Sequence, residues 1–221
     1  MGPDAKDDYL QPPKGVRFSA DSILLAHRLP LVLKGRAADF GSGCGVVGLE
    51  ALRLGRLKGL ETLFFIEVNR DLYFDSLTVN INDWLKDSWL EKKRREEEEK
   101  IGDLFLQLRP VFSDWRYLKP EDLGGLLDYI AVNPPYFPLR SSGLSAKARQ
   151  SARHEAFGSL NELIEAASRL IKPSALLTMT FPRLRLSELI KSAARHGFYP
   201  IRLHLPARAQ ARLVIIDFKK Y

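Results

Sequence analysis

The sequence RAADFGSGCGVVGLEAL, residues 36–52, joins a short apolar strand to a helix through a glycine-rich turn. The apolar run ends at Phe40, and the helical periodicity begins at Val46. Glycine lets the backbone turn sharply and approach a ligand closely, and the first turn of the following helix presents unpaired N–H groups. A strand, a glycine turn and a helix in this order are typical of α/β proteins that bind a nucleotide-like cofactor.

The glycines alone do not identify that cofactor. Gly43, Gly45 and Gly48 fit the dinucleotide pattern G-x-G-x-x-G, with the acidic Glu67 at the end of the next predicted strand. Asp39 favours S-adenosylmethionine instead, because a carboxylate repels a pyrophosphate but accepts hydrogen bonds from an ammonium group. Under either interpretation Glu67 would accept the two ribose hydroxyls. A turn without any ligand is the remaining alternative.

The rest of the chain alternates between predicted strands and helices. Apolar runs rich in β-branched or aromatic residues predict strands at residues 36–40, 62–68, 110–113, 127–132 and 175–181. Helical periodicity between them, as at residues 46–57 and 71–85, gives the order of a mainly parallel sheet with helices on both faces.

Two further features organise the C-terminal part. Ser159 and Glu162 have capping-box spacing, which predicts the start of a helix that continues toward Pro173. Residues 198–205 and 212–218 then predict two strands with a link short enough for a hairpin. We therefore expect an α/β fold with a mostly parallel, seven-stranded sheet that closes with an antiparallel pair.

The predicted strand at residues 127–132 ends in an unusual sequence. The segment LLDYIAVNPPYFP, residues 126–138, changes from apolar strand formers to one amide, two prolines and an aromatic residue. Proline cannot donate to a strand ladder, so the chain must leave the sheet at Asn133. Ligands of open α/β sheets bind at the carboxyl ends of the strands, which makes this turn a candidate catalytic site rather than an ordinary proline-rich turn.

The chemistry that fits this turn is methyl transfer to a planar nitrogen, because the lone pair of the adenine amino group is delocalised and needs orientation. If the Asn133 side-chain oxygen and the Pro134 carbonyl each accept one amino hydrogen, the nitrogen lone pair faces the methyl donor. The rigidity of Pro134 and Pro135 holds these acceptors in place. Tyr136 and Phe137 would stack on a base that has left its neighbours.

The composition predicts one soluble domain in the cytoplasm. The chain has 221 residues, 45% of them hydrophobic, enough for one well-buried core. No stretch approaches the roughly 20 apolar residues of a membrane span, and the charged start lacks the apolar region of a signal peptide. Cys44 is the only cysteine, so we expect no disulfide and no metal, and interpret this thiol as a small buried residue.

Positive charge is concentrated after the NPPY turn. Residues 1–138 hold 19 Lys and Arg against 22 Asp and Glu, whereas residues 139–221 hold 15 against 5. Each phosphate contact adds affinity through counterion release, so this asymmetry favours a nucleic-acid partner over simple solubilising charge. The segment EKKRREEEEK, residues 91–100, carries five charges of each sign and predicts a solvated helical insertion over residues 84–108.

Two more acidic residues are weaker candidates. Asp114 follows the third predicted strand, and it could accept a hydrogen bond from the cofactor's adenine or simply form a turn. Asp21 lies in a predicted short helix, residues 18–27, within an N-terminal leader of residues 1–35. Its carboxylate could close over the methionine end of the cofactor or cap that helix.

These features resemble the class I S-adenosylmethionine-dependent methyltransferases with an N/D-P-P-Y/F/W motif, over nearly the whole chain. Within that class the sequence is most similar to the bacterial valine-tRNA adenine-N6 methyltransferases, which modify the adenine immediately 3′ of the anticodon. The matching segments are VRFSADSILLAH (16–27), DFGSGCG (39–45), NPPYF (133–137) and ARHE (152–155). The charged insertion departs from the family pattern.

The resemblance implies a Rossmann-like fold, S-adenosylmethionine as cofactor, S-adenosylhomocysteine as product and tRNA as partner. The expected cofactor contacts are Asp21, Asp39, Gly41, Ser42, Gly43, Gly45, Glu67, Asp114 and Asn133. The expected catalytic turn is Asn133, Pro134, Pro135 and Tyr136, and the expected nucleic-acid contacts are Phe137, Lys147, Arg149, Arg153 and His154.

Other acceptors remain open. Related NPPY enzymes methylate a glutamine N5 amide in release factors, but they carry a helical domain before the cofactor turn, and 38 residues precede Asp39 here. Guanine N2 of ribosomal RNA is harder to exclude. A catalytically silent RNA-binding protein is a further alternative, which the intact NPPY and glycine turns disfavour. The sequence does not specify an oligomeric state.

Overall fold

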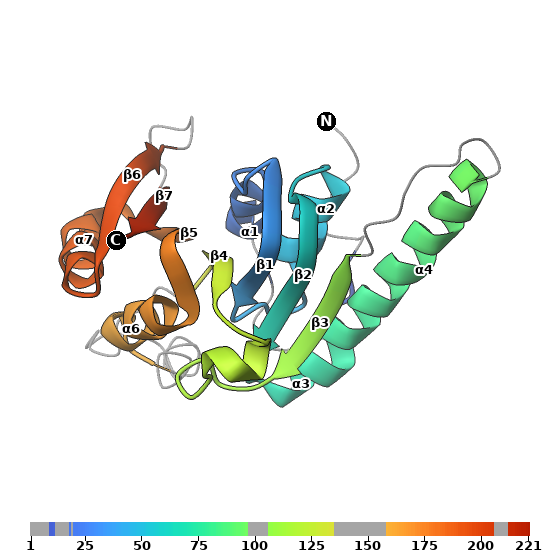
Figure 1. Cartoon of the computed structure of the whole chain (residues 1–221), viewed down its shortest axis with the longest axis horizontal. Coiled ribbons are helices and arrows are strands. Elements are labelled where there is room, and N and C mark those ends of the chain that lie inside the picture. The colour runs from blue at the N-terminus through green and yellow to red at the C-terminus, as the bar shows by residue number, and fades with distance from the viewer. Residues whose placement is uncertain (1–8, 12–17, 19, 97–105, 135–157, 206–211) are drawn as a thin grey trace.

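The computed structural model describes residues 9–11, 18, 20–96, 106–134, 158–205 and 212–221, which build a seven-stranded sheet in the order β3-β2-β1-β4-β5-β7-β6 (Figure 1). The strands are β1 (Val32–Phe40), β2 (Lys58–Glu67), β3 (Gln107–Phe112), β4 (Leu127–Val132), β5 (Ile171–Pro182), β6 (Phe198–His204) and β7 (Leu213–Lys220). Neighbours from β3 to β5 pair in parallel, and β7 pairs antiparallel with both β5 and β6. This confirms the predicted sheet and its antiparallel closing pair.

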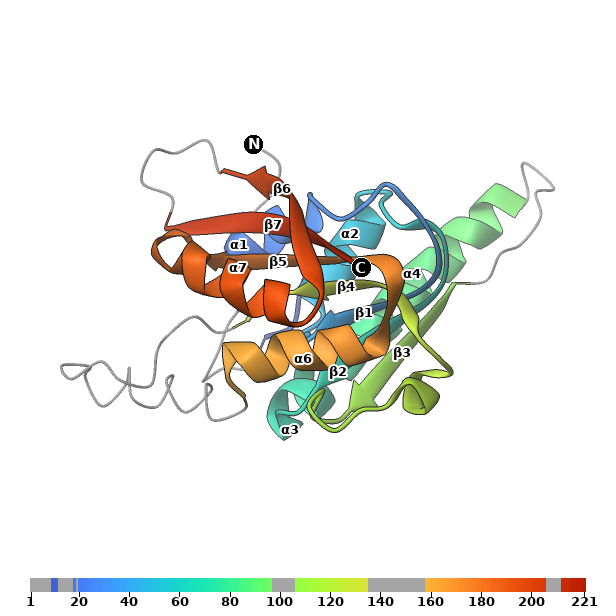
Figure 2. The same cartoon turned by 60° about the vertical axis from the view of Figure 1, so that its left-hand side comes forward.

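Helices cover both faces of the sheet. They are α1 (Ala20–Ala26), α2 (Val46–Arg53), α3 (Arg70–Leu72), α4 (Thr78–Glu96), α6 (Leu160–Leu170) and α7 (Leu186–Arg195), with helical turns η1 (Tyr73–Leu77), η2 (Pro120–Leu123) and η4 (Arg183–Arg185). Figure 2 shows α6 and α7 on one face, with α1 and α2 behind the sheet. Among the described helices, none is long and apolar enough to cross a membrane.

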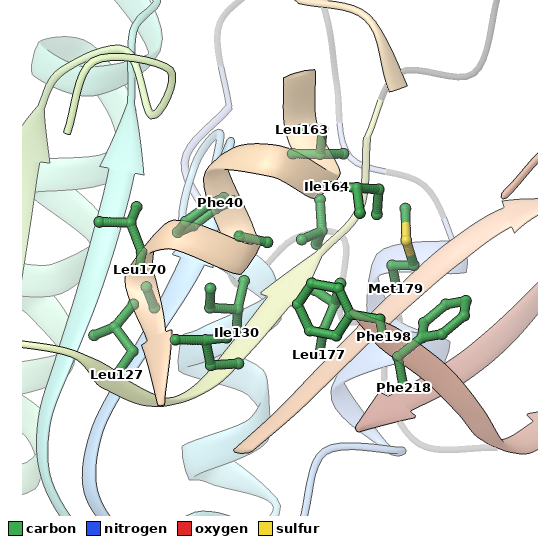
Figure 3. Close-up of a cluster of buried hydrophobic side chains, with 14 of the residues drawn as sticks. Phe40, Leu127, Ile130, Leu163, Ile164, Leu170, Leu177, Met179, Phe198 and Phe218 are labelled. Carbon is green, nitrogen blue, oxygen red and sulfur yellow. The ribbon is translucent and has the colours of Figure 1, made fainter. Parts of the chain in front are cut away.

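The alternation of side chains along the strands divides the core into two clusters. On the α6–α7 face, buried Phe40, Ile130 and Leu177 meet Ile164 and Leu170 of α6 (Figure 3). The opposite cluster joins intervening strand residues to apolar side chains of α1, α2 and α4, among them Leu25, Leu49, Phe65, Ile81 and Tyr129. A sheet covered on both faces exposes its polar backbone turns at the strand ends, where a ligand can approach.

The register brings several predicted site residues to the same edge. Phe40 of β1 pairs with both Ile66 of β2 and Val132 of β4, and Val132 pairs with Met179 of β5. The residues that follow these strand positions therefore emerge together at the carboxyl edge. Gly41 and Asn133 directly follow Phe40 and Val132, the last paired residues of β1 and β4, so both leave the sheet at this edge.

The structure differs from the sequence predictions at three helix boundaries. Helix α2 ends at Arg53 rather than near residue 57, because Gly55 reverses the chain with a φ of 67°. Helix α6 ends at Leu170, since Pro173 favours extended backbone before it, and β5 starts at once. The predicted 71–85 helix is a longer helical stretch, from Arg70 to Glu96, with a π-helical turn at η1.

The predicted helical insertion over residues 84–108 is wrong at its C-terminal end. Strand β3 already begins at Gln107, and Leu108 pairs with Leu63 of β2. The apolar residues just before Gln107 fit the periodicity of a helix as well as that of a strand. The charged run beside them is typical of a helix, which explains the wrong prediction. Helix α4 does continue to Glu96, and residues 97–105 lie outside the described part of the chain.

Candidate active site

The glycine turn after β1 is tied to the end of β2. The backbone N–H groups of Gly41 and Ser42 both donate to the Ile66 carbonyl, at 2.9 and 3.0 Å. Gly43 N donates to Glu67 Oε2 at 2.8 Å. The turn and the end of β2 therefore form one rigid corner at the carboxyl edge.

Two of the four glycines in residues 41–48 border open space, and the other two allow close packing. A Cβ atom built on Gly41 or Gly43 would meet no atom within 4 Å, and both residues have a positive φ. At Gly45 a Cβ would lie 2.8 Å from a Leu77 methyl, and at Gly48 it would lie 2.6 Å from the Phe65 ring. Gly41 and Gly43 therefore border open space that a ligand could fill, whereas Gly45 and Gly48 allow close packing.

Asp39 is a buried carboxylate with unused acceptor capacity. Its side chain is 1% exposed, and Oδ2 accepts a hydrogen bond from Gly48 N at 3.3 Å. Oδ1 is buried and has no hydrogen-bond partner among the described residues. Burial raises the pKa of Asp39 to about 7, and the nearby Glu67 carboxylate adds to this shift. A bound ammonium group would supply both the missing donor and the compensating charge, which fits the cofactor that the sequence favours.

Glu67 is held in place by backbone donors. Oε1 accepts from Val68 N at 2.9 Å and from Asn69 N at 2.7 Å, while Oε2 accepts from Gly43 N. Three such bonds fix the carboxylate at the mouth of the corner, where the predicted contact to ribose hydroxyls would occur. Ser42 Oγ is also buried, with no partner among the residues that the structure describes.

Asp114 lies beyond β3 and is engaged by a cation that the sequence analysis missed. Arg116 donates to it through its backbone N–H and through Nε and Nη2, with a shortest separation of 2.6 Å. The ion pair raises the pKa of Arg116, chiefly through the hydrogen bond to Asp114. Arg116 also lies 3.9 Å from Glu162 at the start of α6. An adenine contact at Asp114 would therefore be made beside an arginine.

Asn133 lies at the end of β4, as predicted, and its side chain bridges two other elements. Its Nδ2 donates to Ser22 Oγ of α1 at 2.7 Å, and its Oδ1 accepts from Thr180 Oγ1 of β5 at 2.5 Å. Asp21, half-buried in the first turn of α1, is adjacent to Ser22. The α1 candidate and the catalytic candidate are thus brought to the same region, although they are more than 110 residues apart in sequence.

Some predictions fall outside the described residues. Pro134 is the last described residue of the turn and is half-buried. The positions that the structure does not describe are Pro135, Tyr136, Phe137, Lys147, Arg149, Arg153 and His154.

Ser22 and Thr180 are not among the site residues predicted from the sequence. The signal available for Thr180 was its hydroxyl in the otherwise apolar strand segment LLTMTF, on the same face as Thr178.

Cys44 has the environment of a packing residue. It is 4% exposed, and burial raises the pKa of its thiol to about 11, so it carries no thiolate near neutral pH. Within the described part of the chain, no group of three or more His, Cys, Asp and Glu side chains could hold a metal ion.

Comparison with known proteins adds sequence relatives and a fold. No protein-family model matches the chain. A tRNA1(Val) (adenine(37)-N6)-methyltransferase from Tolumonas auensis is 26% identical over 185 residues, which cover 83% of this chain and 67% of the relative. The enzyme of the same name from Shewanella frigidimarina is 25% identical over 187 residues, covering 84% and 66%. The chain therefore spans about two thirds of the length of these curated relatives.

Solved structures show the same architecture. The precorrin-6y C5,15-methyltransferase structure from Geobacter metallireducens superposes with a TM-score of 0.55 at 16% identity, and covers 99% of this chain and 98% of that one. Its likeness supports the fold, whereas the relatedness in sequence comes from the tRNA-modifying enzymes. The chain therefore has the fold of the class I S-adenosylmethionine-dependent methyltransferases and is distantly related in sequence to the tRNA1(Val) (adenine(37)-N6)-methyltransferases.

Proposed function

We propose that this protein methylates the exocyclic N6 of an adenine in RNA, and that the RNA is a tRNA modified near its anticodon. The observation that carries the proposal is the position of Asn133. It follows β4 at the carboxyl edge, directly after the Phe40–Val132 pair that precedes the glycine turn, with its amide held by hydrogen bonds on both sides.

The cofactor side of the site is assigned to the corner between β1 and β2. S-adenosylmethionine supplies a methyl group on a positively charged sulfur, which is already activated for transfer. Asp39 would accept hydrogen bonds from its ammonium group, because this carboxylate is buried with an unpartnered Oδ1. The open space at Gly41 and Gly43 suits close approach of a ligand, and Glu67 has the position for the ribose hydroxyls.

The acceptor side is assigned to Asn133 and Pro134. The Asn133 amide oxygen and the Pro134 carbonyl would each accept one hydrogen of the adenine amino group. Held in this way, the nitrogen lone pair would point at the methyl carbon; the carbon–sulfur electrons would stay on the sulfur of S-adenosylhomocysteine, and the proton that the nitrogen loses would pass to water. No strong base is required, since positioning of the two reacting atoms supplies most of the acceleration.

The RNA assignment is supported by charge and by the relatives. Residues 139–221 carry a net charge of +10, from 15 basic and 5 acidic residues. The curated relatives are named for adenine methylation in a valine tRNA. Phe137, Lys147, Arg149, Arg153 and His154 remain the proposed RNA contacts from the sequence.

The experiment that tests this function offers radiolabelled S-adenosylmethionine and purified protein with three acceptors: unmodified total tRNA, ribosomal RNA and a release factor. Nucleoside analysis of the labelled RNA then identifies the product. We expect N6-methyladenosine in tRNA. Label in N2-methylguanosine or in the release factor would overturn the adenine assignment and favour guanine N2 or glutamine N5.

A further inference from the structure

The side-chain amide of Asn133 is hydrogen-bonded to two buried hydroxyl groups from distant parts of the chain. Ser22 of α1 is 3% exposed and accepts from Asn133 Nδ2 at 2.7 Å. Thr180 of β5 is 1% exposed and donates to Asn133 Oδ1 at 2.5 Å. Such buried side-chain pairs hold a group in one geometry, because water cannot replace either partner.

The two contacts define both the plane and the direction of the amide. Two bonds on opposite sides of a planar group stop its rotation about the Cβ–Cγ bond, a torsion that is otherwise broad for asparagine. Asn133 Oδ1 accepts from Thr180 Oγ1, and Asn133 Nδ2 donates to Ser22 Oγ on the other side of the amide. The oxygen of Asn133 therefore faces Thr180. A carbonyl oxygen has two lone pairs, so this bond does not exhaust its capacity as an acceptor.

Position explains why these two hydroxyls are available. Thr180 is the residue that follows Met179, the partner of Val132, so it lies beside Asn133 at the carboxyl edge. Ser22 reaches the same point because α1 packs against α2 and β5, with Leu25 and Ala26 in the core. Neither residue belongs to the NPPY turn, and both are polar residues at buried positions.

We propose that Ser22 and Thr180 are positioning residues that aim the Asn133 oxygen at the acceptor nitrogen. The proposal rests on the proposed function, since it takes Asn133 as the group that binds the acceptor. It holds for any planar nitrogen that the enzyme methylates. Because Ser22 follows Asp21 directly, the same contact also couples α1, on the proposed cofactor side, to the acceptor side.

The main test compares three threonine variants in steady-state methylation of the RNA that the wild type modifies. Thr180→Val removes the donor without a large change in shape, and we expect kcat to fall about 10- to 100-fold, because a misaimed acceptor loses orientation. The KM for S-adenosylmethionine should stay near the wild-type value. Thr180→Ser restores the hydroxyl and should recover most of the rate.

Thr178→Val is the matched control. Thr178 lies two residues earlier on the same face of β5, is 2% exposed, and donates to Asp217 rather than to Asn133. Its substitution should lower thermal stability and leave kcat near the wild-type value. Equal kcat values for Thr180→Val and Thr178→Val would overturn the proposal.

Ser22 has its own matched control. Ser192 of α7 is also a buried serine, and it donates to the side chain of Asn161 of α6 rather than to Asn133. Ser22→Ala should lower kcat, and Ser192→Ala should not. If both variants keep the wild-type kcat, the role assigned to Ser22 is wrong.

A readout without turnover is hydrogen exchange of the Asn133 side-chain amide, followed by NMR in the cofactor-free protein. We expect slow exchange in the wild type and in Thr180→Ser, and faster exchange in Thr180→Val. The same exchange rate in all three would overturn the proposal, even if RNA is methylated as expected. Conversely, label in release factor instead of RNA would overturn the adenine assignment alone, since the variants can be compared on that acceptor.

Discussion

Among single residues, Asp39 lowers the stability of the fold at neutral pH and has a proposed role in binding the cofactor. Its folded pKa of about 7 lies above the ordinary value of 3.8, chiefly because of burial. A carboxyl group whose pKa is higher in the folded than in the unfolded state stabilises the fold only at low pH, where the group is protonated. This contribution is fully present below about pH 4 and is lost as the pH rises through about 7. The protein therefore keeps a destabilising charge at neutral pH in a place where an ammonium could neutralise it.

We predict opposite effects of Asp39→Asn on stability and on cofactor binding. At pH 8 the midpoint of thermal unfolding should rise by roughly 4 °C, equivalent to about 1–2 kcal/mol for a chain of this size. At pH 4.5 the difference should nearly vanish. Affinity for S-adenosylmethionine should fall at least ~10-fold, because the ammonium loses a charged acceptor.

Calorimetry and isothermal titration measure the two quantities on the same preparation. A stability gain that does not depend on pH would contradict the raised pKa. Unchanged cofactor affinity would remove Asp39 from the binding site.

At the scale of elements, the turn between β1 and α2 separates ligand glycines from packing glycines. Gly43 borders open space, and its N–H holds Glu67 at 2.8 Å. Gly48, in the first turns of α2, faces Phe65 and Leu63 of β2. The same residue type therefore serves the proposed cofactor site at one position and helix–sheet packing at the other.

Alanine substitution should distinguish the two kinds of glycine. In Gly43→Ala, the positive φ costs about 1 kcal/mol and the methyl group enters the proposed cofactor space, so affinity should fall more than stability. In Gly48→Ala, the methyl group clashes with the Phe65 ring, so stability should fall by about 1–3 kcal/mol. Denaturant unfolding and cofactor titration provide the comparison; if Gly48→Ala has the larger effect on affinity at equal stability, the assignment is reversed.

Most of these elements could be predicted from sequence because their signals are local. The proline pair after residue 132 marks the end of β4, and the Ser159–Glu162 capping box forms as predicted at the start of α6. The hydrogen bonds of Asn133 to Ser22 and Thr180 could not be predicted, since these residues are 111 and 47 positions away from it in the sequence. The ion pair of Asp114 is local, but which partner a carboxylate takes depends on how the turn folds.

At the scale of the whole molecule, basic side chains gather near the carboxyl edge beside the acceptor side. Arg183 starts η4, directly after β5, and its backbone N–H donates to the Arg212 carbonyl at 2.8 Å. Both arginines are exposed, and Leu184 between the η4 arginines is 98% exposed. Arg183 follows Thr180 by three residues, about 10 Å of extended chain. A phosphate of the RNA beside the target nucleotide would meet positive charge there.

The Arg183→Ala, Arg212→Ala double variant should bind RNA about 10-fold more weakly than the wild type at moderate salt. The slope of log affinity against log salt should become shallower by about 1 to 2, because each lost phosphate contact removes one released counterion. Arg195→Ala is the matched control, since Arg195 is exposed at the other end of α7. Filter binding over a salt series gives both quantities. An equal effect of the control and the double variant would exclude η4 as an RNA contact.

In the proposed reaction, Asn133 presents an acceptor nitrogen to a methyl donor held at the glycine turn. The most direct test measures single-turnover methylation and S-adenosylmethionine affinity for the wild type and for Asn133→Ala on the same preparations. We predict that affinity stays within about threefold, whereas the methylation rate falls by about 10² to 10⁴, the contribution expected of an orienting group. Methylation by Asn133→Ala at the wild-type rate would show that Asn133 does not orient the acceptor nitrogen.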